Sequence, residues 1–215
     1  HTWPTSGHRR RERVGREIGS PRLCSIASVR SKVSMIEDAL RVLAEFPEGE
    51  EDKSRELIQG LLRHGADPFS RDHYTPGHIT CTGVVLSPDR ERVLVVHHRR
   101  LDRWLAPGGH VEPEDVELWR AALREVMEET GALMDPTVSP ALVGMDVHGI
   151  PPKKGEPYHL HHDLKFGFVA MMEQVAVSEE ENRAVEWCGF GEFDRYELPG
   201  SIRRAARRAR ERFAP

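Results

Sequence analysis

The sequence predicts a mixed α/β (α+β) domain in which a sheet lies between helices. Strand-like apolar runs occur both before and after one amphipathic helix, which begins near Leu118 and stops at Gly131. A second amphipathic helix closes the chain. Strands on both sides of a central helix, with a further helix at the end, bury their apolar faces best as a helix-covered sheet. The 215 residues fit one such domain with extensions.

Residues 1–33 are rich in Arg, Ser and Gly and show no clear period, which predicts a disordered basic tail. Met35 opens a well-patterned segment, so residues 1–34 are alternatively upstream or vector-derived sequence. Arg9-Arg10-Arg11 is followed by no apolar stretch, which argues against a secretory signal.

Residues 34–77 predict a helical hairpin and a linker. Ser34 is expected to cap the first helix, and residues 47–49, Pro-Glu-Gly, end it. The second helix runs from about Lys53 to His64, and Gly65 follows it. We expect this hairpin to pack on the domain that follows or on a second subunit, so a homodimer is one expectation.

Residues 78–215 predict the main domain. Alternating or apolar runs indicate its strands, and breaker-rich segments, chiefly 149–157, separate them. The final helix is expected to begin at Ser201, with apolar residues along one face and arginines along the other. The expected strands are 79–86 and 92–98, which a turn at 87–90 joins, then 137–147, 159–172 and 185–190.

The stretch from Pro107 to Ala132 carries the chemistry. Its helix contains Glu125, Glu128 and Glu129 at i, i+3 and i+4, so we expect the three carboxylates to share one face. Close carboxylates repel one another, and a hard divalent cation such as Mg²⁺ takes oxygen ligands of this kind.

This stretch resembles the Nudix box, the signature of hydrolases acting on nucleoside diphosphates linked to another moiety. Gly109 fits the first glycine, and the run Arg124 to Gly131 fits the Arg-Glu-apolar-x-Glu-Glu-x-Gly core. Asp115 replaces the first expected Glu, and eight residues instead of seven separate it from Arg124. The resemblance covers about residues 78–213. It implies the Nudix fold, a mixed sheet between helices, and a nucleotide-derived small-molecule substrate.

The resemblance also implies roles for the box residues. Glu125, Glu128 and Glu129 would hold Mg²⁺, or Mn²⁺ in its place, together with the backbone carbonyl of Gly108. The predicted catalytic residues are Glu125, Arg124 and Glu128, with Arg124 orienting a carboxylate. The general base is either Glu125 or a glutamate of the late loop at 179–181.

Four further residues are predicted to bind the substrate. Arg99 would bind a phosphate or remain a solvated surface residue. Trp104 would stack on a base or pack in the core. Strand alternation places His159, His161 and Asp163 on one face, where His161 and Asp163 would line the substrate cleft or form hydrogen bonds across the sheet. A zinc site on this face is the third alternative.

Asp115 is interpreted as a helix cap instead of a metal ligand, because Asp is shorter than Glu and the extra residue shifts it. Its carboxylate would accept backbone N–H bonds near residues 117 and 118.

Composition indicates the compartment of the protein and the kinds of partner it binds. Three widely spaced cysteines, Cys24, Cys81 and Cys188, indicate free thiols in a reducing compartment, and no apolar run is long enough to span a membrane. We therefore expect a cytoplasmic protein. Residues 1–34 carry +6 and residues 201–215 carry +5 of a net −4, so the remainder carries −15. Such an acidic body does not suggest a dedicated nucleic-acid site.

Two functions follow. The first is a Mg²⁺-dependent hydrolase that cleaves a diphosphate linkage in a nucleoside diphosphate derivative. The alternative is a catalytically weak Nudix-fold module that senses nucleotides or regulates. The presence of all three box glutamates favours the enzyme, and the shifted Asp115 favours the module.

Overall fold

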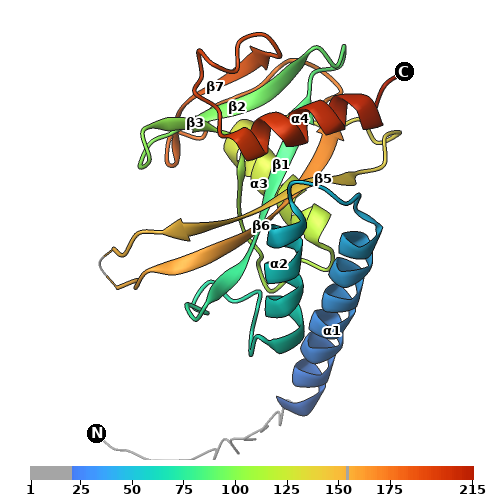
Figure 1. The fold of residues 1–215 in the computed structure, drawn as a ribbon, viewed down its shortest axis with the longest axis vertical. Coiled ribbons are helices and arrows are strands. Elements are labelled where there is room, and N and C mark those ends of the chain that lie inside the picture. The colour runs from blue at the N-terminus through green and yellow to red at the C-terminus, as the bar shows by residue number, and fades with distance from the viewer. Residues whose placement is uncertain (1–20, 154) are drawn as a thin grey trace, which may run out of the picture.

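The computed structural model describes the backbone of residues 21–153 and 155–215, with side chains from residue 32 onward (Figure 1). Four helices and seven strands make up this part of the chain. The helices are α1 (Pro21–Glu45), α2 (Asp52–His64), α3 (Leu118–Thr130) and α4 (Gly200–Arg212). The strands are β1 (Gly77–Leu86), β2 (Arg92–His98), β3 (Arg103–Leu105), β4 (Gly108–His110), β5 (Ala141–Ile150), β6 (His159–Val169) and β7 (Asn182–Gly189).

Strand β1 is the centre of one mixed sheet. The sheet runs in the order β3-β2-β1-β6-β5, while β4 pairs with β1 and β7 pairs with β2. β1 and β6 are parallel over the whole of β1, from Gly77 opposite Leu160 to Leu86 opposite Val169. β4 is antiparallel to β1, with Cys81 opposite Gly109.

Helices cover both faces of the sheet, as the sequence predicts. Along β1, Ile79, Cys81 and Val85 join the buried cluster that contains the apolar face of α3. Val84 and Leu86 point the other way, into the cluster under α4. The alternation of side chains along the strand therefore builds two cores, one on each face.

The α1–α2 hairpin packs on the domain that follows it, which is one of the two packing alternatives that the sequence left open. Its buried residues belong to the same core cluster as α3, and Figure 1 shows it beside β5 and β6. Glu51, at the N-terminus of α2, is only 4% exposed and receives a hydrogen bond from Arg208 of α4. The hairpin is thus tied to the last helix of the chain.

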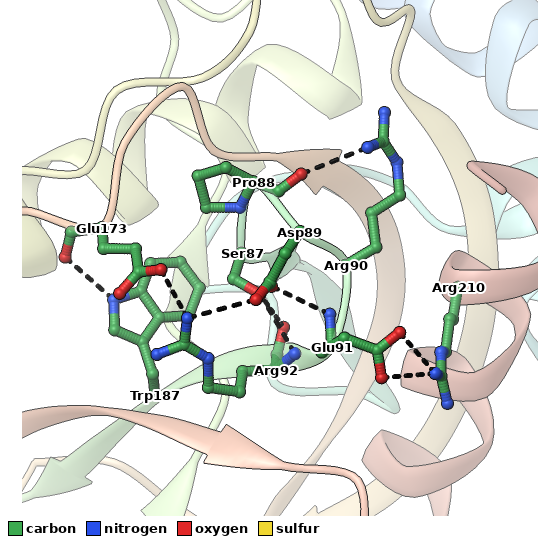
Figure 2. A network of polar contacts seen from close by, with 9 residues as sticks. All are labelled: Ser87, Pro88, Asp89, Arg90, Glu91, Arg92, Glu173, Trp187 and Arg210. Carbon is green, nitrogen blue, oxygen red and sulfur yellow. Dashed lines mark hydrogen bonds and ion pairs between the residues drawn. The ribbon is translucent and has the colours of Figure 1, made fainter. Parts of the chain in front are cut away.

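The turn between β1 and β2 is held by its own side chains (Figure 2). Arg92 donates its backbone N–H to Ser87 Oγ at 3.0 Å, and Glu91 N donates to Asp89 Oδ1 at 3.1 Å. The Arg210 guanidinium of α4 reaches Glu91 at 2.6 Å. This side-chain network fixes one end of α4 to the turn, which the sequence predicts at 87–90.

Helix α1 begins earlier than expected. It starts at Pro21, so the predicted disorder is wrong for residues 21–33, and Ser34 lies inside the helix instead of capping it. Apolar residues continue upstream at helical spacing, including Leu23, Ile26 and Val33, which explains the extension. Residues 1–20 lie outside the described part. At the other end, α4 begins at Gly200 with Pro199 at its N-cap position, and not with a Ser201 cap.

Among the described helices, none is both long and apolar enough to cross a bilayer. Cys81 and Cys188 are buried free cysteines, while the Cys24 side chain lies outside the described ones.

Candidate functional site

The two glycines before the box helix allow β4 to lie directly against α3. A Cβ at Gly109 would come within 2.6 Å of the carboxylate carbon of Glu125. A Cβ at Gly108 would come within 2.6 Å of the Cys81 carbonyl oxygen of β1. A side chain at Gly108 would therefore push β4 away from the backbone of β1, and one at Gly109 would displace the Glu125 carboxylate from the strand.

Glu129 is the most constrained carboxylate of the site. It is 3% exposed and accepts two hydrogen bonds, from the backbone N–H of Gly108 at 2.7 Å and from Asn182 Nδ2 at 2.7 Å. Burial raises the pKa of Glu129 to about 7, and the charges of Glu181 and Glu125 act in the same direction. The two donors offset only part of this effect. A cation close to Glu129 would therefore stabilise its ionised form.

Arg124 gathers the other acidic groups of the box. Its guanidinium donates to Glu125 Oε1 at 2.9 Å and to Glu128 Oε2 at 3.1 Å. It also donates to Asp115 Oδ2 at 3.0 Å and to the carbonyl of His110 at 2.8 Å. Arg124 therefore joins β4, the loop and the helix, as expected of a residue that orients carboxylates.

Asp115 does not cap α3, contrary to the sequence interpretation. The N-cap residue is Glu117, and no side chain bonds to the first turn. Asp115 instead accepts the backbone N–H of Glu112 at 2.8 Å and the guanidinium of Arg124. The loop turns back at residues 112–115, so the carboxylate faces Arg124 and not the helix terminus.

The three box glutamates are neighbours on the helix, but their carboxylates bond to different partners: Glu125 and Glu128 both accept from Arg124 Nη1, and Glu129 accepts from Gly108 and Asn182. Glu125 and Glu129 face β4, whereas the Glu128 side chain is 59% exposed. The i, i+3, i+4 spacing makes them neighbours, but Arg124 draws Glu128 outward while Gly108 and Asn182 hold Glu129 inward.

The inner part of the site still suits a hard cation. Glu125 and Glu129 offer carboxylate oxygens, and Asn182 Oδ1 is buried without a hydrogen-bond partner. Oxygen donors of this kind fit Mg²⁺ or Mn²⁺. Glu128 would reach the same ion only after turning away from Arg124.

The late loop delivers Asn182 and Glu181 to the box. Arg99 holds this loop, because its backbone N–H donates to the Glu181 carbonyl at 2.8 Å and its guanidinium donates to the Asn182 carbonyl at 3.3 Å. Burial raises the pKa of Glu125, Arg124 opposes this effect, and the charges of Glu128 and then Glu181 add to it. Sequence reasoning missed Asn182, because a single Asn at the start of a strand carries no distinctive pattern.

The predicted substrate-binding residues lie apart. Trp104 packs edge-on against Tyr196 and His97, each at 5.0 Å between ring centroids, which favours the packing alternative. Asp163 accepts hydrogen bonds from Thr82 Oγ1 at 2.8 Å and from Lys165 Nζ at 2.5 Å, and it is 5% exposed. This pattern favours hydrogen bonding across the sheet over a place in an open cleft.

His161 lies in a group of histidines on the same sheet face. Its ring centroid is 4.9 Å from that of His78 and 5.5 Å from that of His110. Burial, and then the neighbouring imidazoles, lower the pKa of His161 to about 2. The ring is therefore neutral at physiological pH.

Family comparison identifies the class of protein that this fold and site define. The family model described as the NUDIX domain matches residues 77–211, more than half of the chain. The protein belongs to the Nudix family, and its mixed sheet with helices on both faces is the Nudix fold.

Solved structures with this fold include proteins of several organisms. A Nudix-family hydrolase from Clostridium perfringens is 18% identical, with a TM-score of 0.45 over 62% of this chain and 96% of the other. The NUDIX domain of Shewanella oneidensis NrtR, solved with ADP-ribose, is 18% identical, with a TM-score of 0.49 over 63% and 88%. A C. elegans Ap4A hydrolase is 16% identical, with a TM-score of 0.46 over 63% and 97%.

Proposed function

We propose that the protein is a divalent-metal-dependent hydrolase that cleaves a diphosphate linkage in a nucleoside diphosphate derivative. The observation that carries the proposal is Glu129, buried between Gly108 and Asn182 beside Glu125, with its pKa raised to about 7. Family membership supports the same reaction class. Mg²⁺ is the expected ion, and Mn²⁺ its substitute.

Glu125, Glu129 and the Gly108 carbonyl would hold the ion, with Glu128 joining them on release from Arg124. When bound, the ion would neutralise phosphate charge and acidify a water molecule. Arg124 holds Oε1 of Glu125, which would keep this carboxylate directed at the ion. Arg124 therefore acts as a positioning residue in this scheme.

The chain itself supplies the general base. The base takes a proton from water as the water oxygen attacks phosphorus, and the bond between phosphorus and the bridging oxygen breaks. The leaving phosphate carries away the electron pair. Glu125 remains one candidate, and Glu181 is the stronger of the late-loop candidates because its charge acts on both Glu125 and Glu129.

A nucleotide-derived small molecule is the proposed substrate. Arg99 is the best-positioned phosphate contact of the predicted set, since it is exposed and adjoins the loop that bonds Glu129. Trp104, His161 and Asp163 have weaker support as direct contacts, because packing or hydrogen bonds already occupy them.

A phosphate-release screen tests this function. Its substrates are nucleoside triphosphates, nucleotide sugars, dinucleoside polyphosphates and capped RNA, each with Mg²⁺ and with Mn²⁺. On the best substrate, Glu129→Gln should lower turnover by about 100-fold or more, since a ligand carboxylate is lost. Glu56→Gln, at an exposed glutamate of α2 that belongs to no proposed site, is the matched control and should retain turnover.

The competing function is a nucleotide-sensing module, which the displaced Glu128 and Asp115 favour. The module predicts nucleotide binding without release of phosphate from any compound in the screen. Equal turnover by wild type and Glu129→Gln would instead reject the assigned metal ligands. Cytoplasmic location, a homodimer, and domain boundaries at 34 and 78 remain predictions.

A further inference from the structure

Three histidines meet at one end of the central strand pair, on β1 and β6. His78, His159 and His161 each offer one ligating atom, and these atoms all lie within 4.8 Å of one another. Among the described side chains, no other three histidine, cysteine or acidic residues meet in this way. The parallel register sets His78 opposite His161, and His159 lies two residues earlier on the same face.

Backbone carbonyls fix two of these rings in the orientation and tautomer of metal ligands. His78 Nδ1 lies 3.3 Å from the His73 carbonyl oxygen, and His159 Nδ1 lies 2.9 Å from the Pro157 carbonyl oxygen. A carbonyl oxygen only accepts, so each Nδ1 carries the proton and each Nε2 has the free lone pair. A hydrogen bond from the second ring nitrogen is the usual support of a ligating histidine.

His78 also has an unexplained buried nitrogen. The ring is 1% exposed, and its Nε2 has no hydrogen-bond partner. A buried acceptor without a partner is unfavourable, so this atom calls for an explanation. A bound cation at this position would satisfy the lone pair.

The free ring nitrogens suit a metal ion better than a phosphate. His78 and His159 turn Nδ1 to a carbonyl oxygen, so their Nε2 atoms present lone pairs and not N–H donors. A lone pair ligates a transition metal ion, whereas a phosphate oxygen needs a hydrogen-bond donor.

We propose that His78, His159 and His161 bind one Zn²⁺ ion, at a site separate from the carboxylate site of the box. Imidazole nitrogens select transition metals over Mg²⁺, and three of them leave a fourth position for water. Nitrogens on tetrahedral zinc lie about 3.3 Å apart, so the three atoms, now within 4.8 Å of one another, would draw closer when the ion binds.

Two neighbouring side chains lie outside the set of three. The His110 ring centroid is 5.1 Å from that of His78 and 5.5 Å from that of His161, but its nitrogens are not among the ligating atoms that lie within 4.8 Å of one another. Asp163, two residues after His161, is engaged by Thr80, Thr82 and Lys165. The site is carried by β1 and β6, whereas the box carboxylates lie on α3. Substitutions can therefore remove one site without touching the other.

Zinc binding to the full-length chain tests the proposal. The protein is stripped of metal, and Zn²⁺ is titrated against a chromogenic chelator with Mg²⁺ in excess to fill the box. One equivalent should bind to the wild type. His161→Gln should bind it about 100-fold more weakly or worse, because losing a ligand costs at least as much as losing a supporting hydrogen bond.

Two variants serve as controls. His148 lies on β5 with its ring 5.7 Å from that of His161, outside the group of three, so His148→Gln should bind zinc like the wild type. Glu129→Gln should also retain zinc, which separates this site from the proposed hydrolase site. Zinc lost in Glu129→Gln but kept in His161→Gln would overturn the proposal.

Cobalt provides a measurement that needs no variant. Co²⁺ in the wild-type site should give the intense visible absorption of a four-coordinate ion, and Zn²⁺ should displace it. The weak spectrum of a six-coordinate ion, or fewer than one bound equivalent, would overturn the assignment even if His161→Gln failed to fold.

Discussion

Glu129→Gln should stabilise the metal-free protein at alkaline pH while abolishing its proposed activity. The pKa of Glu129 is raised from 4.5 to about 7 by burial, so the native state binds a proton that the unfolded state releases. The neutral form of Glu129 makes its full contribution to the free energy of unfolding below the pKa that Glu129 has in the unfolded chain. It is lost as the pH rises through about 7.

The size of the effect follows from this shift. Between about pH 5 and pH 8, ionisation of Glu129 should remove about 2.5 kcal/mol from the free energy of unfolding of the wild type. Gln carries no charge, and its carbonyl can still accept the Gly108 N–H. If the Asn182 amide turns over, its unpartnered Oδ1 would accept from the new NH₂ group.

The assay is denaturant unfolding of both proteins in chelator at the two pH values. Titration of the histidines is common to both proteins, so the difference between them isolates Glu129. Glu128→Gln removes the same charge from an exposed neighbour and should follow the wild type. Parallel stability curves for wild type and Glu129→Gln would refute the reasoning, since they would mean that Glu129 ionises equally in both states.

Further outcomes follow from other contacts. Asp115→Ala should lower the unfolding free energy by about 2 kcal/mol by leaving Arg124 and a backbone N–H without their acceptor, while Asp115→Asn should lose less; thermal melts that are equal for both would contradict this. Glu51→Ala should cost about 2 kcal/mol, because the Arg208 side chain, which is 32% exposed, loses its hydrogen bond to this buried carboxylate; chemical denaturation measures it, and an unchanged midpoint would rule it out. A chain starting at Met35 keeps every buried side chain described for α1, so its melting temperature should stay within a few degrees of the full chain; clear loss of folding would show that the preceding residues matter.

Local sequence patterns predict most of the elements. The expected strands at 79–86 and 92–98 correspond to β1 and β2, and the expected helix ending at Gly131 corresponds to α3. Gly131 has φ = 61°, the left-handed conformation that ends helices. These elements depend on residues that are close in the sequence, so the sequence alone is enough to predict them.

Pairing between distant segments was not predictable in the same way. Alternation assigns His161 to a face, but it does not say that β1 brings His78 to lie opposite. The sequence therefore showed two histidines where the structure has a group of three. Likewise, helical spacing made Glu128 a neighbour of Glu129, but the hydrogen bonds that separate them come from Arg124, β4 and the late loop.

The parallel pairing of β1 with β6 also determines when during synthesis the protein can acquire its sites. Thr80 and Asp163 are 83 residues apart in sequence, and Glu129 is 53 residues from Asn182. Closing such long loops has an entropic cost before any contact forms. A nascent chain that has not yet released β6 and β7 from the ribosome leaves both faces of β1 incomplete. Its box helix can form locally, but the histidine group cannot assemble until synthesis has passed His161, and Glu129 cannot gain its partner until synthesis has passed Asn182.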